Sequence, residues 1–484
     1  MSAASSTELV EGGELVYAGT GSWSLAGRAA KTGATEGKDG VVAPNLMGFV
    51  RLSPLSGVKI TSVISGCVAS HTFAIAADGR SFIWGRNENN QLGFGDRVNI
   101  YNPTPFKVSE TDVVTGGACG AKHTLITTSS GTMFACGKND YGQCGIGRVG
   151  PDVSNWTVVP IAGVTQAAAG RTHSLLLTVR RETYAFGCPE YGQLGNGTDG
   201  KMLERAGKIT FTNEPRPIVV QGLIGVPVDA IACGSNHCVV ADEEGKVYTW
   251  GFAGYGRLGH GDNKDQFEPK LLEYFANEAK PKPPNIPAFM WRSPAPRRAQ
   301  HITCGATATY LIDLNGALYM WGITKKAGEA MMRPEVVGDV SGWSCRSVGC
   351  GNTSTIVAAE KSLITWGPSP TYGELGYGAD GAKSSTRANE VEDIKGSHVV
   401  QVAMGYAHSC VIVKVEGDDA LAVRGREAVA ALPLYSPDEP DPATGVAAEA
   451  AASSGGGQSG PTGKRKVAKG GKGGKGKKKA RASK

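Results

Sequence analysis

Charged and aromatic residues are scarce in this chain, and long apolar runs are absent. Charged side chains make up 19% and aromatic side chains 7% of the 484 residues, which argues against a charge-rich helical protein. No stretch of 18 apolar residues occurs, so the sequence predicts no membrane-spanning helix. The segment Met1–Leu9 has neither a basic start nor an apolar core, so we expect no secretory signal.

Cysteine and glycine narrow the class of protein further. The 11 cysteines are odd in number and come without a secretory signal, so we expect reduced thiols rather than a disulfide framework. Glycine is abundant, with 69 residues, roughly twice the usual fraction of about 7%. These glycines keep no period of three, which excludes collagen. A globular chain of this composition is expected to consist of many short strands joined by turns.

Positive charge is concentrated at one end of the chain. The formal net charge is +6, yet the segment Lys464–Lys484 holds eleven Lys and Arg and no acid, which leaves −5 for residues 1–463. From about Gly417 the chain is rich in small residues and Pro, so we expect it to be disordered. We predict a disordered N-terminus over 1–12, a folded domain over 13–415 and a disordered tail over 416–484 that ends in the Lys-rich segment.

A pattern recurs along the folded part of the sequence. Each copy has a Cys-Gly or related pair, a His shortly after it, an apolar run ending in an aromatic and a Gly, and a closing loop of the form Gly-x-Leu-Gly-x-Gly. In chain order the His position holds His71, His123, His173, His237, Ala308, Ser354 and His408. The Cys position holds Cys67, Cys119, Cys233, Cys304 and Cys350. The fifth copy lacks the closing loop.

The seventh copy is split between the two ends of the chain. Its first half ends near residue 410, and Gly13–Gly19 supplies the matching second half. A blade completed by strands from both termini closes a ring with backbone hydrogen bonds and leaves only short edges. The sequence therefore predicts an all-β, seven-bladed β-propeller closed by its N- and C-terminal strands, with Leu15–Ala18 paired in the blade that contains Met404–Val413.

The Cys-Gly-x-x-His and Gly-x-Leu-Gly-x-Gly elements resemble the regulator of chromosome condensation repeat, over residues 13 to about 414. The Trp-Asp dipeptide of one large propeller family is absent, and the Gly-Gly doublet of kelch blades does not recur. The Gly-Trp-Arg-His-Thr motif of a related plant photoreceptor branch is also missing. Four runs resemble one subfamily in particular: Phe186–Gly195, Trp250–His260, Trp366–Gly378 and Gln401–Ser409.

This resemblance implies a role in mitosis and chromosome segregation. Members of that subfamily act at centromeres and the spindle midzone, bind small GTPases of the Rac, Arf and Ral types, and have been described as exchange factors. The founding family member exchanges nucleotide on Ran while bound to nucleosomes. We therefore expect a monomeric nuclear protein that binds a small GTPase of one of these types. A non-catalytic interaction scaffold in cytoskeletal or checkpoint complexes, without exchange activity, is the alternative.

The repeated Cys and His side chains raise the question of a metal site or a catalytic dyad. Metal ligands must converge on one ion at about 2.0–2.3 Å. Because each Cys/His pair belongs to a different blade, we expect buried structural side chains bonded to neighbouring backbone, and no metal. Near-identical copies are typical of scaffolding, so we expect no catalytic residue. The Gly-rich loops open no helix and carry no Lys, so we expect no bound nucleotide or other cofactor.

Partner-binding residues are expected where the copies differ from one another. The insertions 199–225 and 277–298 carry basic residues and a Trp, which are enriched at interface hot spots. Both are equally compatible with tolerated surface loops. The loop 368–377 holds two prolines and forms a third expected contact surface. The candidate residues are Lys201, Arg205, Trp291, Arg292, Tyr372 and Glu374.

The basic tail is expected to act in nuclear import and in binding to phosphates. A cluster of Lys and Arg resembles a nuclear localisation signal. Gly-spaced lysines suit sequence-independent contact with chromatin, other nucleic acid or microtubules, and such binding weakens with salt. No aromatic is interleaved, so base stacking is not expected, and a purely solubilising tail is the alternative. The candidate residues are Lys464, Arg465, Lys466, Lys477, Lys478 and Lys479.

Overall fold

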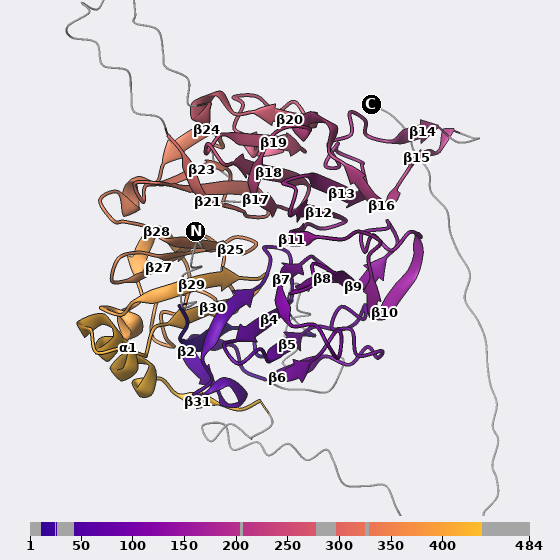
Figure 1. Cartoon of the computed structure of the whole chain (residues 1–484). Coiled ribbons are helices and arrows are strands. Elements are labelled where there is room, and N and C mark those ends of the chain that lie inside the picture. The colour runs from indigo at the N-terminus through magenta and orange to yellow at the C-terminus, as the bar shows by residue number, and fades with distance from the viewer. Residues whose placement is uncertain are drawn as a thin grey trace, which may run out of the picture. The chain divides into compact units, whose positions relative to one another are not determined.

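The computed structural model describes residues 11–24, 26, 43–203, 207–276, 297–324 and 329–437. Within these ranges the strands form six four-stranded sheets and one five-stranded sheet, which we number as blades one to seven, and one separate two-stranded sheet (Figure 1). The first strand of each blade contacts the first strand of the next, and blade seven contacts blade one, so the sheets close a ring. The predicted seven-bladed propeller is confirmed.

In blades one to six the four strands are antiparallel neighbours that follow one another along the chain, whereas blade seven has the order β29-β30-β1-β2-β31. Blade one comprises β3 (Ile60–Ile64), β4 (His71–Ala76), β5 (Ser81–Gly85) and β6 (Ile100–Phe106). Blade two comprises β7 (Val114–Cys119), β8 (His123–Thr128), β9 (Met133–Asn139) and β10 (Gly150–Val158). Blade three comprises β11 (Val164–Ala169), β12 (His173–Thr178), β13 (Thr183–Gly187) and β16 (Glu214–Val219). Blade four comprises β17 (Val228–Cys233), β18 (His237–Asp242), β19 (Val247–Gly251) and β20 (Gln266–Leu271). Blade five comprises β21 (Ala299–Cys304), β22 (Ala308–Asp313), β23 (Leu318–Gly322) and β24 (Met331–Val336). Blade six comprises β25 (Ser347–Cys350), β26 (Thr355–Ala358), β27 (Leu363–Gly367) and β28 (Ser385–Glu390). Blade seven comprises β29 (Val399–Met404), β30 (His408–Val413), β1 (Glu14–Gly19), β2 (Leu46–Leu52) and β31 (Leu434–Tyr435).

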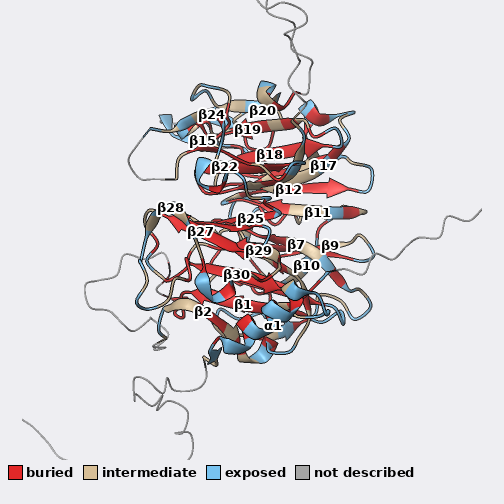
Figure 2. Cartoon of the chain, turned by 90° about the vertical axis from the view of Figure 1, so that its left-hand side faces the viewer, coloured by how far each residue is buried: buried red, intermediate tan, exposed pale blue. Residues whose placement is uncertain are grey.

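The hydrophobic core lies between adjacent blades rather than within any one of them. In Figure 2 the strands are mostly red, the colour of buried residues. One cluster joins Phe73 and Ile83 of blade one to Val114 and Ile126 of blade two. The second strand of each blade is buried along its whole length, because both of its faces are covered by neighbouring blades. A blade therefore depends on its neighbours to bury its apolar side chains.

The seam of the ring is closed as the sequence predicts. Strand β1 pairs with β30, with Leu15 opposite Ile412 and Ala18 opposite Ser409, and its other edge pairs with β2. Backbone hydrogen bonds between Gly13 and Ile60 add a link from the N-terminal strand to blade one. The two ends of the chain thus complete one sheet between them.

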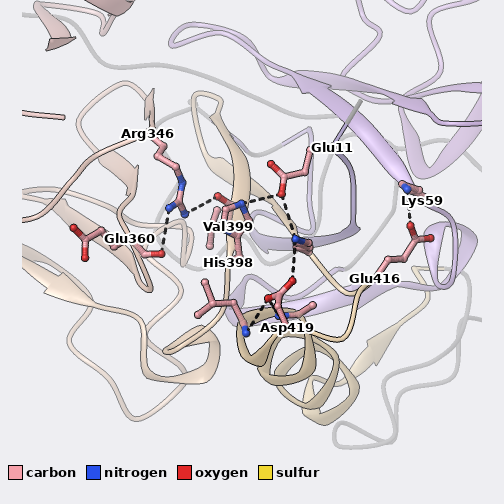
Figure 3. Close-up of polar contacts among 11 residues, drawn as sticks. Glu11, Lys59, Arg346, Glu360, His398, Val399, Glu416 and Asp419 are labelled. Carbon is pink, nitrogen blue, oxygen red and sulfur yellow. Dashed lines mark hydrogen bonds and ion pairs between the residues drawn. The ribbon is translucent and has the colours of Figure 1, made fainter. Parts of the chain in front are cut away.

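Side chains reinforce this seam on one side of the ring (Figure 3). The Glu11 carboxylate lies 3.1 Å from His398 Nε2 and 3.8 Å from Lys414 Nζ, and Lys414 also pairs with Asp419 at 3.1 Å. Arg346 of the preceding blade donates to the Val399 carbonyl oxygen at 3.2 Å. The assignment of Glu11 to a disordered N-terminus is therefore wrong, since its carboxylate bridges the residue before β29 and the residue after β30.

The folded part also extends beyond the predicted boundary at residue 415. A helix, α1 (Ala420–Ala431), follows β30, and β31 then pairs in parallel with β2. The Asp419 side chain caps the helix by accepting from Leu421 N and Ala422 N at 3.1 and 3.0 Å. The helix buries mainly small residues, together with Val429, which explains why its composition resembles that of a disordered segment.

In the described ranges, no helix is long and apolar enough to cross a bilayer.

Candidate partner-binding face

The antiparallel order of the strands gives every blade two ends, and therefore gives the ring two faces. Connections between first and second strands and between third and fourth strands lie on one face, which we call the closing-loop face. The other connections lie on the opposite face. The insertion at 199–213 joins β13 to β16 and belongs to the closing-loop face, whereas Ala276 and Arg297, which flank the second insertion, lie on the opposite face. The described ends of the two insertions therefore lie on different faces, and loop 368–377, the third predicted surface, joins β27 to β28 on the closing-loop face.

The first insertion forms a two-stranded ribbon of β14 (Lys201–Leu203) and β15 (Ile209–Phe211) beside blade three (Figure 1). Its apolar side chains face solvent: Leu203 is 77% and Met202 56% exposed, and Ile209 is also exposed. The predicted residue Lys201 is exposed on the same ribbon. A hydrogen bond from Thr212 N to the Gly200 carbonyl oxygen, 2.8 Å long, closes the base of the ribbon. Folding leaves this apolar surface uncovered within the described part of the chain.

Several predicted site residues cannot be placed on either face. Arg205, Trp291 and Arg292 lie outside the described residues. The tail residues lie outside them as well: Lys464, Arg465, Lys466, Lys477, Lys478 and Lys479. Their roles remain predictions from the sequence.

Tyrosine occupies one repeated position on the closing-loop face in four blades. The position precedes the first Gly of the closing loop and holds Tyr141, Tyr191, Tyr255 and Tyr372. The side chains of Tyr141 and Tyr255 are exposed, and those of the other two are partly buried. Sequence reasoning singled out Tyr372 alone, although the recurring Tyr-Gly step beside the closing loop carries the signal for all four.

Two of these tyrosines, Tyr191 of blade three and Tyr255 of blade four, are linked through aromatic and cationic side chains. The rings of Tyr191 and Phe252 lie with centroids 4.9 Å apart, although they come from blades three and four. The Arg257 guanidinium stacks over Phe252 at 4.7 Å and lies 5.9 Å from the ring of Tyr255. Such stacking fixes planar side chains at the rim of this face and adds about 0.5–2 kcal/mol per cation–π contact.

Glu374 does not belong to the contact surface that the sequence predicts. Its side chain is buried and turns back into its own loop, where Oε2 accepts from Tyr372 N at 2.9 Å. Gln143 and Gln193 occupy the same repeat position and accept in the same way from the backbone N two residues earlier. Burial raises the pKa of the Glu374 carboxyl, and the hydrogen bonds that it accepts lower it in part. The loop therefore uses this side chain to hold its own shape.

In the five blades that carry it, the repeated His joins its blade to the next. His71 Nε2 lies 2.7 Å from Thr124 Oγ1, and His123 Nε2 lies 2.9 Å from Ser174 Oγ. The partner is in each case the residue that follows the His of the next blade, so the expectation of a bond to backbone is wrong. Burial lowers the pKa of His71 and His123 to about 3, so these imidazoles are neutral. Their role is structural.

A ring of seven sheets, with this histidine link between blades and this closing loop, defines a propeller of the regulator of chromosome condensation type. The sequence model of the "Regulator of chromosome condensation (RCC1) repeat" matches residues 78–127, 130–177, 182–241 and 244–312. The chain is 38% identical over 439 residues to human Protein RCC2, covering 88% of this chain and 80% of that protein. It is 37% identical to the zebrafish Protein RCC2 homolog, covering 88% of this chain and 84% of that one. The chain therefore belongs to this family, which confirms the resemblance.

Solved structures agree on the fold. The crystal structure of Prp20p from Saccharomyces cerevisiae, described with its binding properties to Gsp1p and histones, superposes with a TM-score of 0.61 at 20% identity. The match covers 86% of this chain and 95% of that one. At this level of identity the similarity shows the architecture alone.

Proposed function

We propose that this chain binds a small GTPase on the closing-loop face and regulates its nucleotide exchange. The observation that carries the proposal is the exposed apolar ribbon of β14 and β15 on the face that also displays the tyrosines. Uncovered apolar surface rimmed by polar residues is typical of interaction sites. Membership of a family of GTPase regulators supports the class of partner, as does the binding of Prp20p to Gsp1p.

The mechanism is displacement rather than covalent chemistry. A rigid ring holds the ribbon, and Leu203 and Met202 at its surface insert against the loops with which the GTPase holds its nucleotide. If the ribbon binds the nucleotide-free GTPase better than the loaded one, linkage requires that it weaken nucleotide binding by the same factor. Partner types to be tested are Ran, Rac, Arf and Ral.

Release of labelled nucleotide from this panel of GTPases tests the proposal. The full chain should accelerate release from at least one member, and Leu203→Asp should reduce the effect at least about tenfold, as loss of a hot-spot side chain does. Ile224→Asp is the matched control, because Ile224 is 65% exposed but lies in the connection between β16 and β17 on the opposite face. Binding without acceleration would identify a scaffold instead, and an equal effect of both variants would remove the ribbon from the site.

We further propose that the protein works in the nucleus and on mitotic chromosomes, centromeres and the spindle, with the basic tail as its tether. The support is the family and the eleven like charges of Lys464–Lys484. Such a run binds phosphates without reading sequence. This arrangement would hold the closing-loop face close to a GTPase that is active at chromosomes.

A further inference from the structure

The junction between blades three and four differs chemically from the other histidine-linked junctions. At the junctions after blades one, two and four, the His Nε2 meets a hydroxyl group of the next blade. After blade three, His173 Nε2 lies 3.3 Å from the thiol of Cys238. Cys233 is the direct antiparallel partner of Cys238 across β17 and β18. Two sulfur atoms and an imidazole therefore meet at one point.

These three side chains converge closely enough to share one ion. One donor atom from each of His173, Cys233 and Cys238 lies within 4.8 Å of the others, and all three residues are buried. Among the described residues they form the group of three that meets this condition. The expectation that the Cys and His positions cannot meet because they belong to different blades is wrong here, since each His reaches the next blade.

We propose that His173, Cys233 and Cys238 bind a zinc ion that links blades three and four. Thiolate and imidazole ligands select zinc or monovalent copper. Two thiolates neutralise a divalent cation, and a neutral complex costs least in a site from which water is excluded. The Gln193 carbonyl oxygen lies 3.3 Å from Cys238 Sγ but accepts a hydrogen bond from Trp250 Nε1 at 3.0 Å, so the three side chains are the protein ligands. Burial of every ligand makes this a structural site.

The fold provides both a loss and a gain variant. Cys238→Thr restores the hydroxyl found at other junctions and should remove the ion while keeping the blade intact. At the next junction, His237 Nε2 lies 2.9 Å from Thr309 Oγ1. Cys304, the direct partner of Thr309 across β21 and β22, is the counterpart of Cys233. Thr309→Cys should therefore create a second site with the same three ligand types.

Metal content of the full-length protein, purified from zinc-supplemented medium and dialysed against a chelator, tests the assignment. The expected values are about one zinc per chain for the native sequence, near zero for Cys238→Thr and about two for Thr309→Cys. Replacement by cobalt should give thiolate-to-metal charge-transfer absorption that Cys238→Thr lacks. Absence of zinc from the native protein, or equal zinc in Cys238→Thr, overturns the proposal. Loss of two titratable thiols without metal would identify a disulfide instead and also overturn it.

Discussion

The Tyr310 hydroxyl of blade five lies 2.9 Å from Thr355 Oγ1 of blade six, and both side chains are buried. Blade five has Ala308 where five of the blades have His, so it lacks the imidazole that reaches the next blade. Tyr310, two residues further along β22, makes the contact instead, with Thr355 at the same repeat position, the residue that follows Ser354. The link between blades is thus kept by a different side chain on the same strand.

Replacing Tyr310 by Phe should destabilise the ring by about 1–2 kcal/mol, because the Thr355 hydroxyl loses its partner in a buried setting. The free energy of unfolding from denaturant titration measures this loss. Tyr255→Phe is the control, since Tyr255 is exposed on the closing-loop face and should change stability by less than about 0.5 kcal/mol. Equal effects of the two substitutions would contradict a structural role for the Tyr310 bond.

The histidine links predict that stability falls with acid. His123 has a pKa of about 3 in the folded protein because it is buried, against about 6.5 when unfolded. Between these values the unfolded chain binds the extra proton, so stability drops by about 1.4 kcal/mol per pH unit for each such His as pH falls below 6.5. His71 and His408 have the same shift. Urea midpoints at several pH values between 7 and 5 measure the slope.

Two substitutions at the bond between His123 and Ser174 distinguish the effect of protonation on stability from the effect of losing the contact. His123→Asn should lower by about one the number of protons taken up on unfolding, and should therefore reduce the slope of stability against pH. Ser174→Ala breaks the same 2.9 Å bond but keeps the buried imidazole, so it should lower stability while preserving the slope. The opposite pattern would show that the acid sensitivity arises elsewhere.

The repeat was readable from the sequence because each blade reuses the same turns and the same buried strand. Leu15–Ala18 could be assigned to the last blade since its pattern matched a missing half. Contacts between blades could not be predicted from the sequence, because they depend on which side chains face each other across a junction. Within their own copies of the repeat, nothing marks Tyr310 or Cys238 as a residue that contacts the neighbouring blade. The sequence predicts Glu374 to be an exposed contact residue for a related reason. A charged side chain is expected at the surface unless the conformation of the surrounding loop shows that it is buried.

Glu374→Gln should stabilise the protein by about 1 kcal/mol at neutral pH. The folded pKa of Glu374 is raised by burial, so the unfolded chain holds fewer protons and stability falls as pH rises through the shifted range. Gln at this position in blades two and three makes the same bond to the backbone without a charge. Gln193→Glu is the reciprocal variant and should destabilise. Thermal unfolding at pH 7 compares the two, and loss of stability in Glu374→Gln would show that the carboxylate is required.

The position of α1 predicts where the chain can be shortened. A protein that ends at residue 437 should keep the stability of the full chain, whereas one that ends at 415 should lose several kcal/mol. Val429 and Leu432 pack in one cluster with Phe49 and Val413, and burial of each is worth about 1.5–3 kcal/mol. Denaturant midpoints of the two shortened proteins test this. Equal midpoints would mean that the helix contributes nothing to the closure of the ring.

The tail should dominate binding to nucleic acid, and salt reveals how. Each phosphate that a Lys or Arg neutralises releases counterions, so the logarithm of affinity falls with the logarithm of salt by about 0.9 per contact for duplex DNA. Replacing Lys477, Lys478 and Lys479 by Gln should therefore reduce this slope by up to about three, and should do so equally on unrelated DNA sequences. The matched control replaces the same three residues by Arg, which keeps the charge and should keep the slope. Fluorescence anisotropy of labelled duplexes across a salt series measures both. An unchanged slope in the Gln variant would place DNA binding on the ring instead and leave the tail a solubilising segment.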